Sequence, residues 1–459
     1  MEEIMAYTVT NPFTEEVIAT YPETSFEELE RALKQAEDYY FTSKNESVAS
    51  RAKKLLAIAD LMDSKREELA QTASLSMGKL ITQALSEVDL CVEIMRYYAT
   101  QGPQMLATKP YIYGLRREAF LHYESSGIVL AVEPWNFPYS QVIRVFAPNY
   151  LLGNPVILKH ASQVATCAQA LDDLMSEAKL APGAFKNLFL SYQQVDEVLA
   201  DKRVSGLAVT GSSQVGQKLA AKAAANLVKT SLELGGNDAF LVLKDADAVK
   251  AAHDAVSARL RNCGQVCTAP KRLIVAKEVA DEFIKLVTDE LNKVKLGNPL
   301  EETTTLAPLA SKAGLELLDE QVTMACENGA KVLVAGGKVT EQTGYFYRPV
   351  LLTGLEKQNP LYDQEFFGPV LQVYVANDEV EMLSIANDSS YGLAGAVYSQ
   401  DVVHANEVAQ RLITGQVFIN QPAASHPELP FGGVNQSGYG RELSNLGLYE
   451  FANQKIIAW

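Results

Sequence analysis

Apolar residues in the first hundred positions recur every three or four residues, which is typical of helices that bury one face. This spacing predicts amphipathic helices over residues 25–40, 47–78 and about 80–100. The next stretch, 109–122, is basic and aromatic and has no helical period, so we expect a β-ribbon there. A ribbon that leaves the main body exposes its edges, which indicates pairing with a second subunit.

From residue 127 onward, short apolar runs alternate with helical segments. Such a succession favours a parallel, doubly wound sheet, in which ligands bind at the carboxyl ends of the strands. The expected strands are 127–132, 155–158, 187–190, 206–209 and 231–234, and the expected helices begin near Ser140, Gln163, Gln194 and Gln214.

The remainder of the chain predicts a second α/β region and an apolar tail. A chain of 459 residues exceeds what one hydrophobic core usually encloses, so two or more domains are expected. The tail, Ile456-Ile457-Ala458-Trp459, can add a strand to a neighbouring subunit's sheet. The second region spans about 237–433 and has apolar segments at 273–275, 331–334, 372–375 and 417–419.

Charge and cysteine usage narrow the class of protein. The chain has 40 basic and 56 acidic residues, a net charge of −16, which argues against nucleic acid as the main partner. Residues 1–20 contain acids and no apolar core, so we expect no signal peptide, and no apolar run is long enough to make the membrane a partner. Five scattered cysteines favour reduced thiols in the cytoplasm over a disulfide framework.

Cys267 is the first candidate for covalent chemistry. It follows a helical run over 247–260 and precedes a proline and the β-branched segment 272–275, so it should lie on a loop. A cysteine is more often a small buried side chain than a nucleophile, so Cys267 alone is weak evidence of an enzyme.

Other motifs strengthen the assignment of Cys267. Together with Gly264-Gln265-Val266-Cys267, they resemble the aldehyde dehydrogenase superfamily over nearly the whole chain. The resemblance implies a doubly wound cofactor domain, a second α/β catalytic domain, a small β ribbon for oligomerisation, and a homodimer or homotetramer. The motifs are Pro134-Trp135-Asn136-Phe137-Pro138, Leu232-Glu233-Leu234-Gly235-Gly236-Asn237, Gln364-Glu365-Phe366-Phe367-Gly368-Pro369 and Pro430-Phe431-Gly432-Gly433. The implied domains are 1–106 with 126–236 for the dinucleotide, 237–436 for catalysis, and 107–125 with 437–459 for bridging between subunits.

The same resemblance implies three catalytic residues. A thiolate that adds to an aldehyde gives a tetrahedral alkoxide, which transfers a hydride to a nicotinamide and leaves a thioester. Cys267 is the implied nucleophile, and Asn136 and the Cys267 backbone N–H are the implied donors to the alkoxide. Glu233 is the implied general base for hydrolysis, and burial between two leucines can raise its pKa.

The expected phosphate loop covers residues 209–216. It follows a strand and opens a helix, where free backbone N–H groups and the helix dipole favour a phosphate. It has neither the Gly-x-Gly-x-x-Gly pattern nor the P-loop pattern, so spacing alone leaves a plain strand-to-helix turn as an alternative. The resemblance assigns Gly211 and Ser212 to the pyrophosphate side of the cofactor.

Further cofactor residues come from the resemblance. Lys159 matches the adenosine-ribose lysine, and Ser162 replaces a glutamate that many NAD-preferring members have. Lysine and serine can donate to a 2′-phosphate that a carboxylate would repel, so NADP is expected to be preferred and NAD allowed. Ser162 could also cap the helix at Gln163. Trp135, Glu365 and Phe367 match residues near the nicotinamide ribose, although Glu365 could equally be a surface acid.

Three residues indicate the aldehyde. Arg144, Arg261 and Ser425 resemble the carboxylate-binding set of succinate semialdehyde dehydrogenases, so oxidation of succinate semialdehyde to succinate is expected. A single arginine could instead pair with a surface acid. Glutarate semialdehyde and other aliphatic aldehydes remain alternatives, because one methylene changes specificity by only about 1–3 kcal/mol.

Two other classes of protein are alternatives to an aldehyde dehydrogenase. A cysteine-dependent acyl hydrolase needs a histidine base, and none of the five histidines lies in a recognisable pairing motif. A binding protein without catalysis does not need Asn136, Glu233 and Cys267 together. Cys263 is expected to be a small buried side chain, and a redox partnership with Cys267 under oxidant is a further hypothesis.

Overall fold

Helices form most of the amino-terminal part of the computed structural model, which describes residues 6–459. A hairpin of β1 (Ala6–Thr10) and β2 (Val17–Pro22) precedes them. The predicted helical stretch 47–78 is two helices, because the backbone leaves the helical conformation at Lys65. Residues 1–5 lie outside the described residues; they belong to the predicted dinucleotide domain and to the stretch 1–20 for which no signal peptide was expected. The helices are α1 (Phe26–Ser43), α2 (Val48–Ser64), α3 (Arg66–Met77) and α4 (Ile81–Met105).

The first large sheet has six strands in the order β19-β9-β8-β5-β6-β7, and all pair in parallel except β19. Helices pack on both faces, α2 to α6 on one and α1, α7 and α8 on the other, so the doubly wound sheet is confirmed. The strands are β5 (Ile128–Glu133), β6 (Val156–His160), β7 (Phe185–Asn187), β8 (Val204–Thr210), β9 (Lys229–Glu233) and β19 (Gly438–Tyr439). The helices are α5 (Ser140–Leu152), α6 (Ala165–Glu177), α7 (Tyr192–Ala200) and α8 (Ser213–Ala225).

The second large sheet has seven strands in the order β12-β15-β16-β11-β10-β17-β18, with only β12 antiparallel to its neighbour. Helices α9, α10 and α11 cover one face, and α12 and α13 cover the other. The strands are β10 (Ala239–Val242), β11 (Arg272–Ala276), β12 (Lys331–Val334), β15 (Val350–Thr353), β16 (Val370–Ala376), β17 (Ala394–Tyr398) and β18 (Gln416–Ile419). The helices are α9 (Ala248–Leu260), α10 (Ala280–Leu291), α11 (Lys312–Glu327), α12 (Glu379–Asn387) and α13 (Val402–Ala409).

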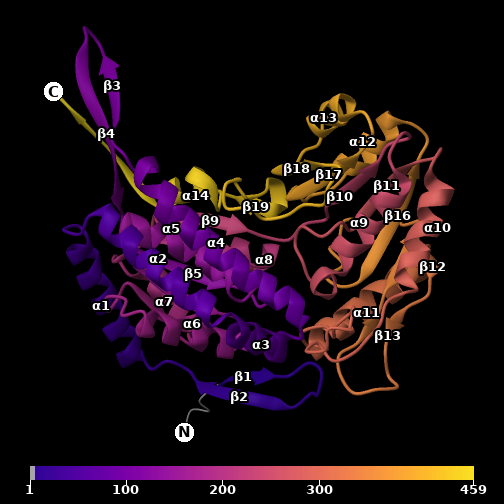
Figure 1. Ribbon diagram of the computed structural model, residues 1–459, viewed down its shortest axis with the longest axis horizontal. Helices are drawn as coiled ribbons and strands as arrows, with labels where there is room; N and C mark the ends of the chain where they lie inside the picture. The colour runs from indigo at the N-terminus through magenta and orange to yellow at the C-terminus, as the bar shows by residue number, and fades with distance from the viewer. Residues whose placement is uncertain (1–5) are drawn as a thin grey trace.

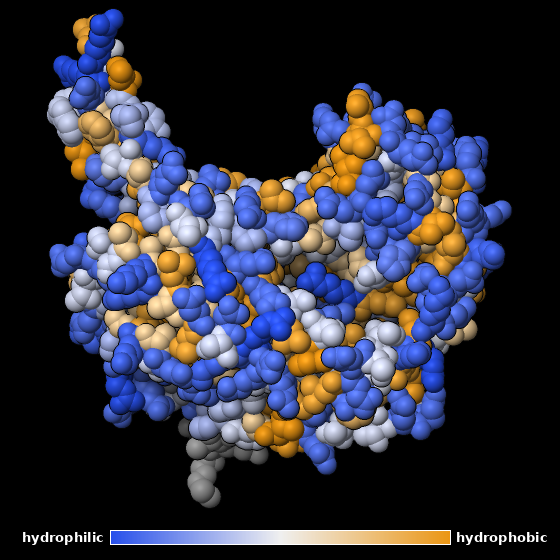
Figure 2. Space-filling view, viewed as in Figure 1, coloured by the Kyte–Doolittle hydropathy of each residue, from blue (hydrophilic) through white to orange (hydrophobic). Residues whose placement is uncertain are grey.

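A third sheet projects from the first body as a narrow arm (Figure 1). It joins β3 (Lys109–Tyr113), β4 (Arg117–Ser125) and β20 (Ala452–Ala458), so the predicted ribbon is present. The apolar tail adds its strand to β4 of its own chain, and the expectation of a neighbour's sheet therefore applies only to the outer edge of β20. Figure 2 shows apolar side chains along this arm. Ile112 and Trp459 are 78% and 68% exposed.

Smaller elements complete the chain. The strand predicted at 187–190 ends at Asn187, and the helix predicted near Gln163 starts as a 3₁₀ turn, Ser162–Val164, before α6. Among residues 6–459, no helix combines the length and the apolar character that crossing a bilayer requires. The remaining elements are β13 (Gly337–Lys338), β14 (Tyr347–Arg348), α14 (Ser444–Glu450) and the 3₁₀ turns Arg261–Gly264 and Asn435–Ser437.

Candidate active site

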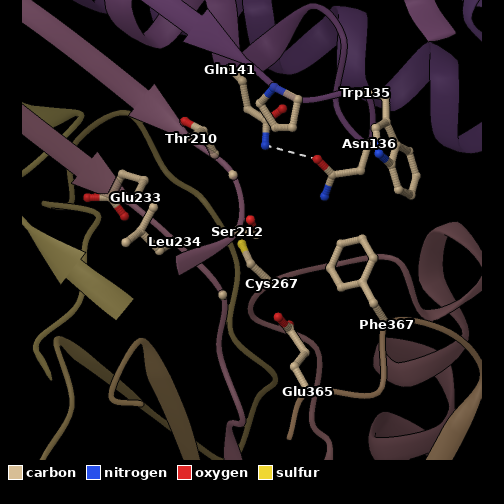
Figure 3. Close-up of a pocket in the computed structure, with 13 residues that line it drawn as sticks. Trp135, Asn136, Gln141, Thr210, Ser212, Glu233, Leu234, Cys267, Glu365 and Phe367 are labelled. Carbon is tan, nitrogen blue, oxygen red and sulfur yellow. Dashed lines mark hydrogen bonds between the residues drawn. The ribbon is translucent and has the colours of Figure 1, made fainter. Parts of the chain in front are cut away.

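A cavity of about 270 Å³ lies at the carboxyl ends of β5, β8 and β9, where the loop after α9 approaches from the second body (Figure 3). Parallel strands present their carboxyl ends at one edge, so side chains far apart in sequence meet there. The sequence-predicted residues that line this cavity are Trp135, Asn136, Gly211, Ser212, Glu233, Cys267, Glu365 and Phe367.

A tight turn after α9 brings Cys267 to the cavity. Asn262 and Cys263 have φ of 50° and 54°, and Gly264 has φ of 76°. A side chain at Gly264 would place its Cβ 2.2 Å from the Gly368 carbonyl oxygen, so only glycine fits. Beyond the turn Cys267 is half-buried and borders the core of the first body.

Cys263 faces the other way and packs in the core of the second body, so the expectation of a small buried side chain is confirmed. Burial raises the pKa of its thiol far above the usual value. A buried thiol of this kind is chemically inert unless the loop opens. Its redox partnership with Cys267 stays a prediction.

The Cys267 thiol also needs help to ionise. Burial raises its pKa to about 12, while the nearby Lys271 ammonium acts in the opposite direction. At neutral pH the sulfur therefore carries its proton, and nucleophilic attack requires a base that removes it.

The Asn136 amide has a fixed orientation beside the sulfur. Its Nδ2 donates to the Gln265 carbonyl oxygen at 3.0 Å. Its Oδ1 accepts from Gln141 Nε2 at 3.2 Å (Figure 3). Within residues 6–459 the second Nδ2 hydrogen and the Cys267 backbone N–H have no protein acceptor. Two donors are thus available next to the sulfur, as an alkoxide requires. The Gln141 contribution was missed in the sequence.

Glu233 is almost fully buried at the end of β9, with neither carboxyl oxygen hydrogen-bonded inside the described part of the chain. Burial, and after it the charge of Glu442, raise its pKa well above the usual value. The carboxyl group turns away from Cys267 in Figure 3, and a Cβ at Gly432 would lie 2.6 Å from its Oε1. Proton exchange with the sulfur needs a side-chain rotation or an intervening water.

Two more buried carboxyl groups surround Glu233, and neither was anticipated from the sequence. Glu133 is the last residue of β5, and Glu442 follows β19. Strand β8, which ends at Thr210, lies between β5 and β9, the strand that ends at Glu233. Burial raises the pKa of both added carboxyls, and the Glu442 charge raises that of Glu133 further. Arg144 Nη1 is 3.5 Å from a Glu442 oxygen. The charges of Arg144 and Arg441 act in the opposite direction on Glu233, but two cations cannot balance three ionised carboxylates at low dielectric, so at least one proton is retained in this cluster.

The side of the cavity near the N-terminus of α8 has free backbone N–H groups and open space beside Gly211. Ser212 caps α8 and accepts from Val215 N–H, and a Cβ at Gly211 would meet no atom within 4 Å. The helix N-terminus therefore presents backbone N–H groups to open space, which fits a phosphate. The rings of Trp135 and Phe367 are in edge-to-face contact, with their centres 5.7 Å apart, and together form one side of the cavity (Figure 3).

Lys159 and Ser162 lie beyond the cavity lining, at the end of the neighbouring strand β6 and just after it. Lys159 Nζ donates to the His160 carbonyl oxygen at 3.2 Å, and no carboxylate within residues 6–459 pairs with it. An unpaired cation here fits an added phosphate. The alternative that Ser162 caps a helix is wrong, because the cap positions are Ala161 and Val164.

The three residues expected to bind a substrate carboxylate share one narrow pocket. Arg144, Arg261 and Ser425 line it together with Cys267, which also borders the larger cavity. Arg144 donates to the Ser425 hydroxyl, and its guanidinium lies 4.3 Å from the centre of the Phe431 ring. The alternative of a surface ion pair is wrong for Arg144, since its acid partner Glu442 is buried.

Arg261 differs from Arg144 in its surroundings. Its guanidinium lies 5.4 Å from the Phe137 ring centre, and within the described residues it makes no ion pair. A partly buried arginine without an acid can accept a carboxylate from a ligand. The Cys267 thiol thus lies between the larger cavity and the narrow pocket that contains the two arginines.

Sequence comparison extends over almost the whole chain. A family model described as the aldehyde dehydrogenase family matches residues 2–457. Succinate-semialdehyde dehydrogenase [NADP(+)] of Deinococcus radiodurans is 40% identical over 451 residues, which are 98% of this chain and 94% of that relative. The protein of the same name from Mycobacterium avium is 38% identical over 450 residues, 97% of this chain and 95% of the relative.

Solved structures also match almost the whole chain. Succinic semialdehyde dehydrogenase from Streptococcus pyogenes, in complex with NADP⁺, superposes with a TM-score of 0.96 at 43% identity and covers 98% of this chain and 99% of its own. Betaine aldehyde dehydrogenase from Staphylococcus aureus, a variant in complex with NAD⁺, gives a TM-score of 0.95 at 30% identity, with 99% and 92% covered.

Proposed function

Because this chain belongs to the aldehyde dehydrogenase family, we propose that it oxidises succinate semialdehyde to succinate with NADP, and with NAD as a second cofactor. The observation that carries this proposal is the position of Cys267, which borders both the larger cavity and the pocket of the two arginines. An aldehyde with a carboxylate a few bonds away would span that junction.

The reaction starts with loss of the Cys267 proton, since burial keeps this thiol protonated at neutral pH. Glu233 is the carboxylate that takes the proton, after a side-chain rotation or through a water. The sulfur then bonds to the aldehyde carbon, and the carbonyl oxygen becomes an alkoxide. The free Asn136 N–H and the Cys267 backbone N–H donate to that oxygen.

A nicotinamide bound in the larger cavity supplies the hydride acceptor. The carbon that bears the alkoxide would lose its hydrogen as hydride to that acceptor and regain its C=O bond, and the acyl group would remain on the Cys267 sulfur as a thioester. Glu233, ionised again, removes a proton from a water that attacks the thioester carbon. The carbon–sulfur bond breaks, succinate leaves, and the sulfur regains a proton. Arg144 and Arg261 hold the remote carboxylate throughout, so the reacting carbon stays next to the sulfur.

The cofactor is held by residues from both bodies. We propose Gly211 and Ser212 for the pyrophosphate, Lys159 and Ser162 for the adenosine ribose and its 2′-phosphate, and Trp135, Glu365 and Phe367 for the nicotinamide end. Ser162 is exposed and free of a capping role, and Lys159 lacks an acid partner in residues 6–459. Both features support NADP, because a 2′-phosphate adds two negative charges near them.

Arg261 gives the sharpest test of the substrate. We expect Arg261→Met to raise KM for succinate semialdehyde by roughly 10- to 100-fold, because charge-assisted bonds to a carboxylate contribute about 1.5–3 kcal/mol. An uncharged aldehyde of similar length should change by less than about threefold, since it makes no such bond. The measurement is steady-state kinetics with both aldehydes.

Two features make Arg261 preferable to Arg144 for this test. Removing Arg144 leaves Glu442 buried without its cation, which threatens folding. Arg261 forms no ion pair within residues 6–459, and Glu87, whose charge acts on it, is paired with Lys79. Arg261→Lys keeps the charge and serves as the matched control, with an intermediate KM expected. Equal losses for the charged and the uncharged aldehyde would contradict the proposed substrate.

Assembly and compartment are proposed from the ribbon and the cysteines. The outer edge of β20 is unpaired within the described chain, and Ile456 and Trp459 are exposed beside it, so we propose a homodimer or homotetramer that covers this arm. All five cysteines are free thiols, which supports a cytoplasmic protein. We propose that residues 1–106 with 126–236 form the dinucleotide-binding domain, 237–436 the catalytic domain, and 107–125 with 437–459 the segments that bridge subunits.

A further inference from the structure

Lys271 is a fully buried ammonium group directly behind the nucleophile. It lies four residues after Cys267, just before β11, and its side chain has no exposed surface. Its Nζ donates to the Val266 carbonyl oxygen at 2.9 Å and to the Cys267 carbonyl oxygen. It also forms an ion pair with Glu365 Oε1 at 2.9 Å. The nucleophile loop and the cofactor-side carboxylate are therefore attached to one cation.

Glu365 connects this cation to the turn that carries the general base. Its side chain is 16% exposed and paired, so the alternative of a surface acid is wrong. A Cβ at Gly235 would lie 2.5 Å from Glu365 Oε2, which places the carboxylate against the turn after Glu233. One oxygen thus faces Lys271 and the other faces this turn at the cavity wall.

Other charged groups near Lys271 also act on the sulfur. Asp238 is buried and accepts from Ala394 N–H at 3.2 Å. Its pKa is raised to about 7, because burial outweighs the opposing charge of Lys271. For the Cys267 thiol, burial has the largest effect, followed by the opposing charge of Lys271; Glu365 and Asp238 raise its pKa and Arg144 lowers it. Of the charges that act on the Cys267 sulfur, that of Lys271 favours the negative form most strongly.

A side chain that only held the loop in place by hydrogen bonds would not need a charge. Two backbone carbonyls can be held by neutral donors, whereas a buried ammonium carries a desolvation cost of several kcal/mol unless it is paired. The pairing with Glu365 supplies that compensation and also fixes the carboxylate. The charge of Lys271 is therefore the feature that demands a function.

We propose that Lys271 is a positioning residue, which orients Glu365 toward the nicotinamide ribose and favours the thiolate of Cys267 through its charge. The proposal rests on the proposed function, since both partners are assigned there. It predicts that the cation affects cofactor affinity and sulfur reactivity together, although the two groups belong to different parts of the site.

The test compares Lys271→Met, of similar length and without charge, with Lys271→Arg, which keeps the charge. In protein without cofactor, the rate of Cys267 alkylation by iodoacetamide is followed against pH, and the alkylated peptide is identified by mass spectrometry. For Lys271→Met we expect an alkylation rate about tenfold lower near pH 8, with its midpoint moved to higher pH, because loss of one nearby cation disfavours the thiolate. Lys271→Arg should stay within about threefold of the parent.

Kinetics supply the second readout. Lys271→Met should raise KM for NADP by about tenfold and leave KM for succinate semialdehyde within about threefold, because the disturbed carboxylate lies on the cofactor side. Glu365→Gln should move the alkylation midpoint to lower pH, and the pair Lys271→Met with Glu365→Gln should return it close to the parent value. This double substitution separates charge from shape.

The outcomes distinguish the possibilities. A Lys271→Met protein that folds, keeps the parent alkylation midpoint and loses only kcat would overturn the proposal. That result is expected if Lys271 holds the loop without any electrostatic effect on the sulfur. If Lys271→Met does not fold, Glu365→Gln decides, and an unmoved midpoint counts against the proposal. Absence of succinate semialdehyde oxidation by the parent would instead refute the proposed function, while the alkylation series still tests the charge.

Discussion

Replacing Cys267 by alanine is expected to lower kcat for succinate semialdehyde oxidation by at least about 10⁴-fold, because no other described nucleophile lines both pockets. The methyl group cannot form a bond to the aldehyde carbon, so neither the alkoxide nor the thioester arises. NADP binding should persist, since the cofactor residues are unchanged. Absorbance of reduced nicotinamide measures the first quantity, and fluorescence titration measures the second.

Cys263→Ala is the matched control. Cys263 lies in the same loop but packs in the core of the second body, so its replacement should leave kcat within about threefold while costing some stability. Activity that survives in Cys267→Ala, or disappears equally in Cys263→Ala, would show that the wrong sulfur has been assigned.

Replacing Glu233 by glutamine is expected to lower kcat by about 10²- to 10⁴-fold through loss of the general base. The amide has the same shape and still fits the buried end of β9, so the fold should persist. Both steps that use this base should slow, and hydrolysis should slow more, because a base from solvent can still remove the Cys267 proton, whereas water attacks a thioester slowly without a positioned base. Rapid mixing should therefore show one early burst of reduced nicotinamide per subunit, followed by a slow steady rate.

The pH dependence follows from the raised pKa of Glu233. Burial and the Glu442 charge shift it upward, and a carboxyl acts as a base only when ionised. The kcat of the parent protein should therefore be low below the raised pKa of Glu233 and should increase as the pH rises through it. Glu233→Gln should lose that rise. A steep acid limb that persists in the variant would assign the base to another group, such as the buried carboxyls of Glu133 or Glu442.

Much of the fold was predictable because a parallel sheet covered by helices leaves a clear pattern. Strands β5, β6, β8 and β9 are short, nearly continuous apolar runs, and each was expected within a few residues of its position. β10 and β17 were missed, since Ala239–Val242 and Ala394–Tyr398 are short, contain small residues and adjoin glycines that resemble a loop. The break at Lys65 was also missed, because both flanking segments keep a helical period.

The site residues that the motifs contain could be assigned from the sequence, but their partners could not. Gln141 orients Asn136 from the first turn of the following helix, and that role depends on a side-chain direction. Lys271 looks like an ordinary basic residue before a strand until the fold brings Glu365 to it. Glu133 and Glu442 are 309 residues apart in the sequence, and the charge of Glu442 acts on Glu133 only because the fold buries both. Buried polar partners are set by tertiary contacts, which single-sequence patterns do not contain.

One measurement tests the central claim most directly. Glu233→Gln is mixed with NADP and succinate semialdehyde, quenched in acid within the burst, digested and analysed by mass spectrometry. We predict a succinyl group on the peptide that contains Cys267, on the Cys267 sulfur, in an amount equal to the reduced nicotinamide formed. A burst without this adduct, or an adduct on Cys263 or another residue, would contradict the account.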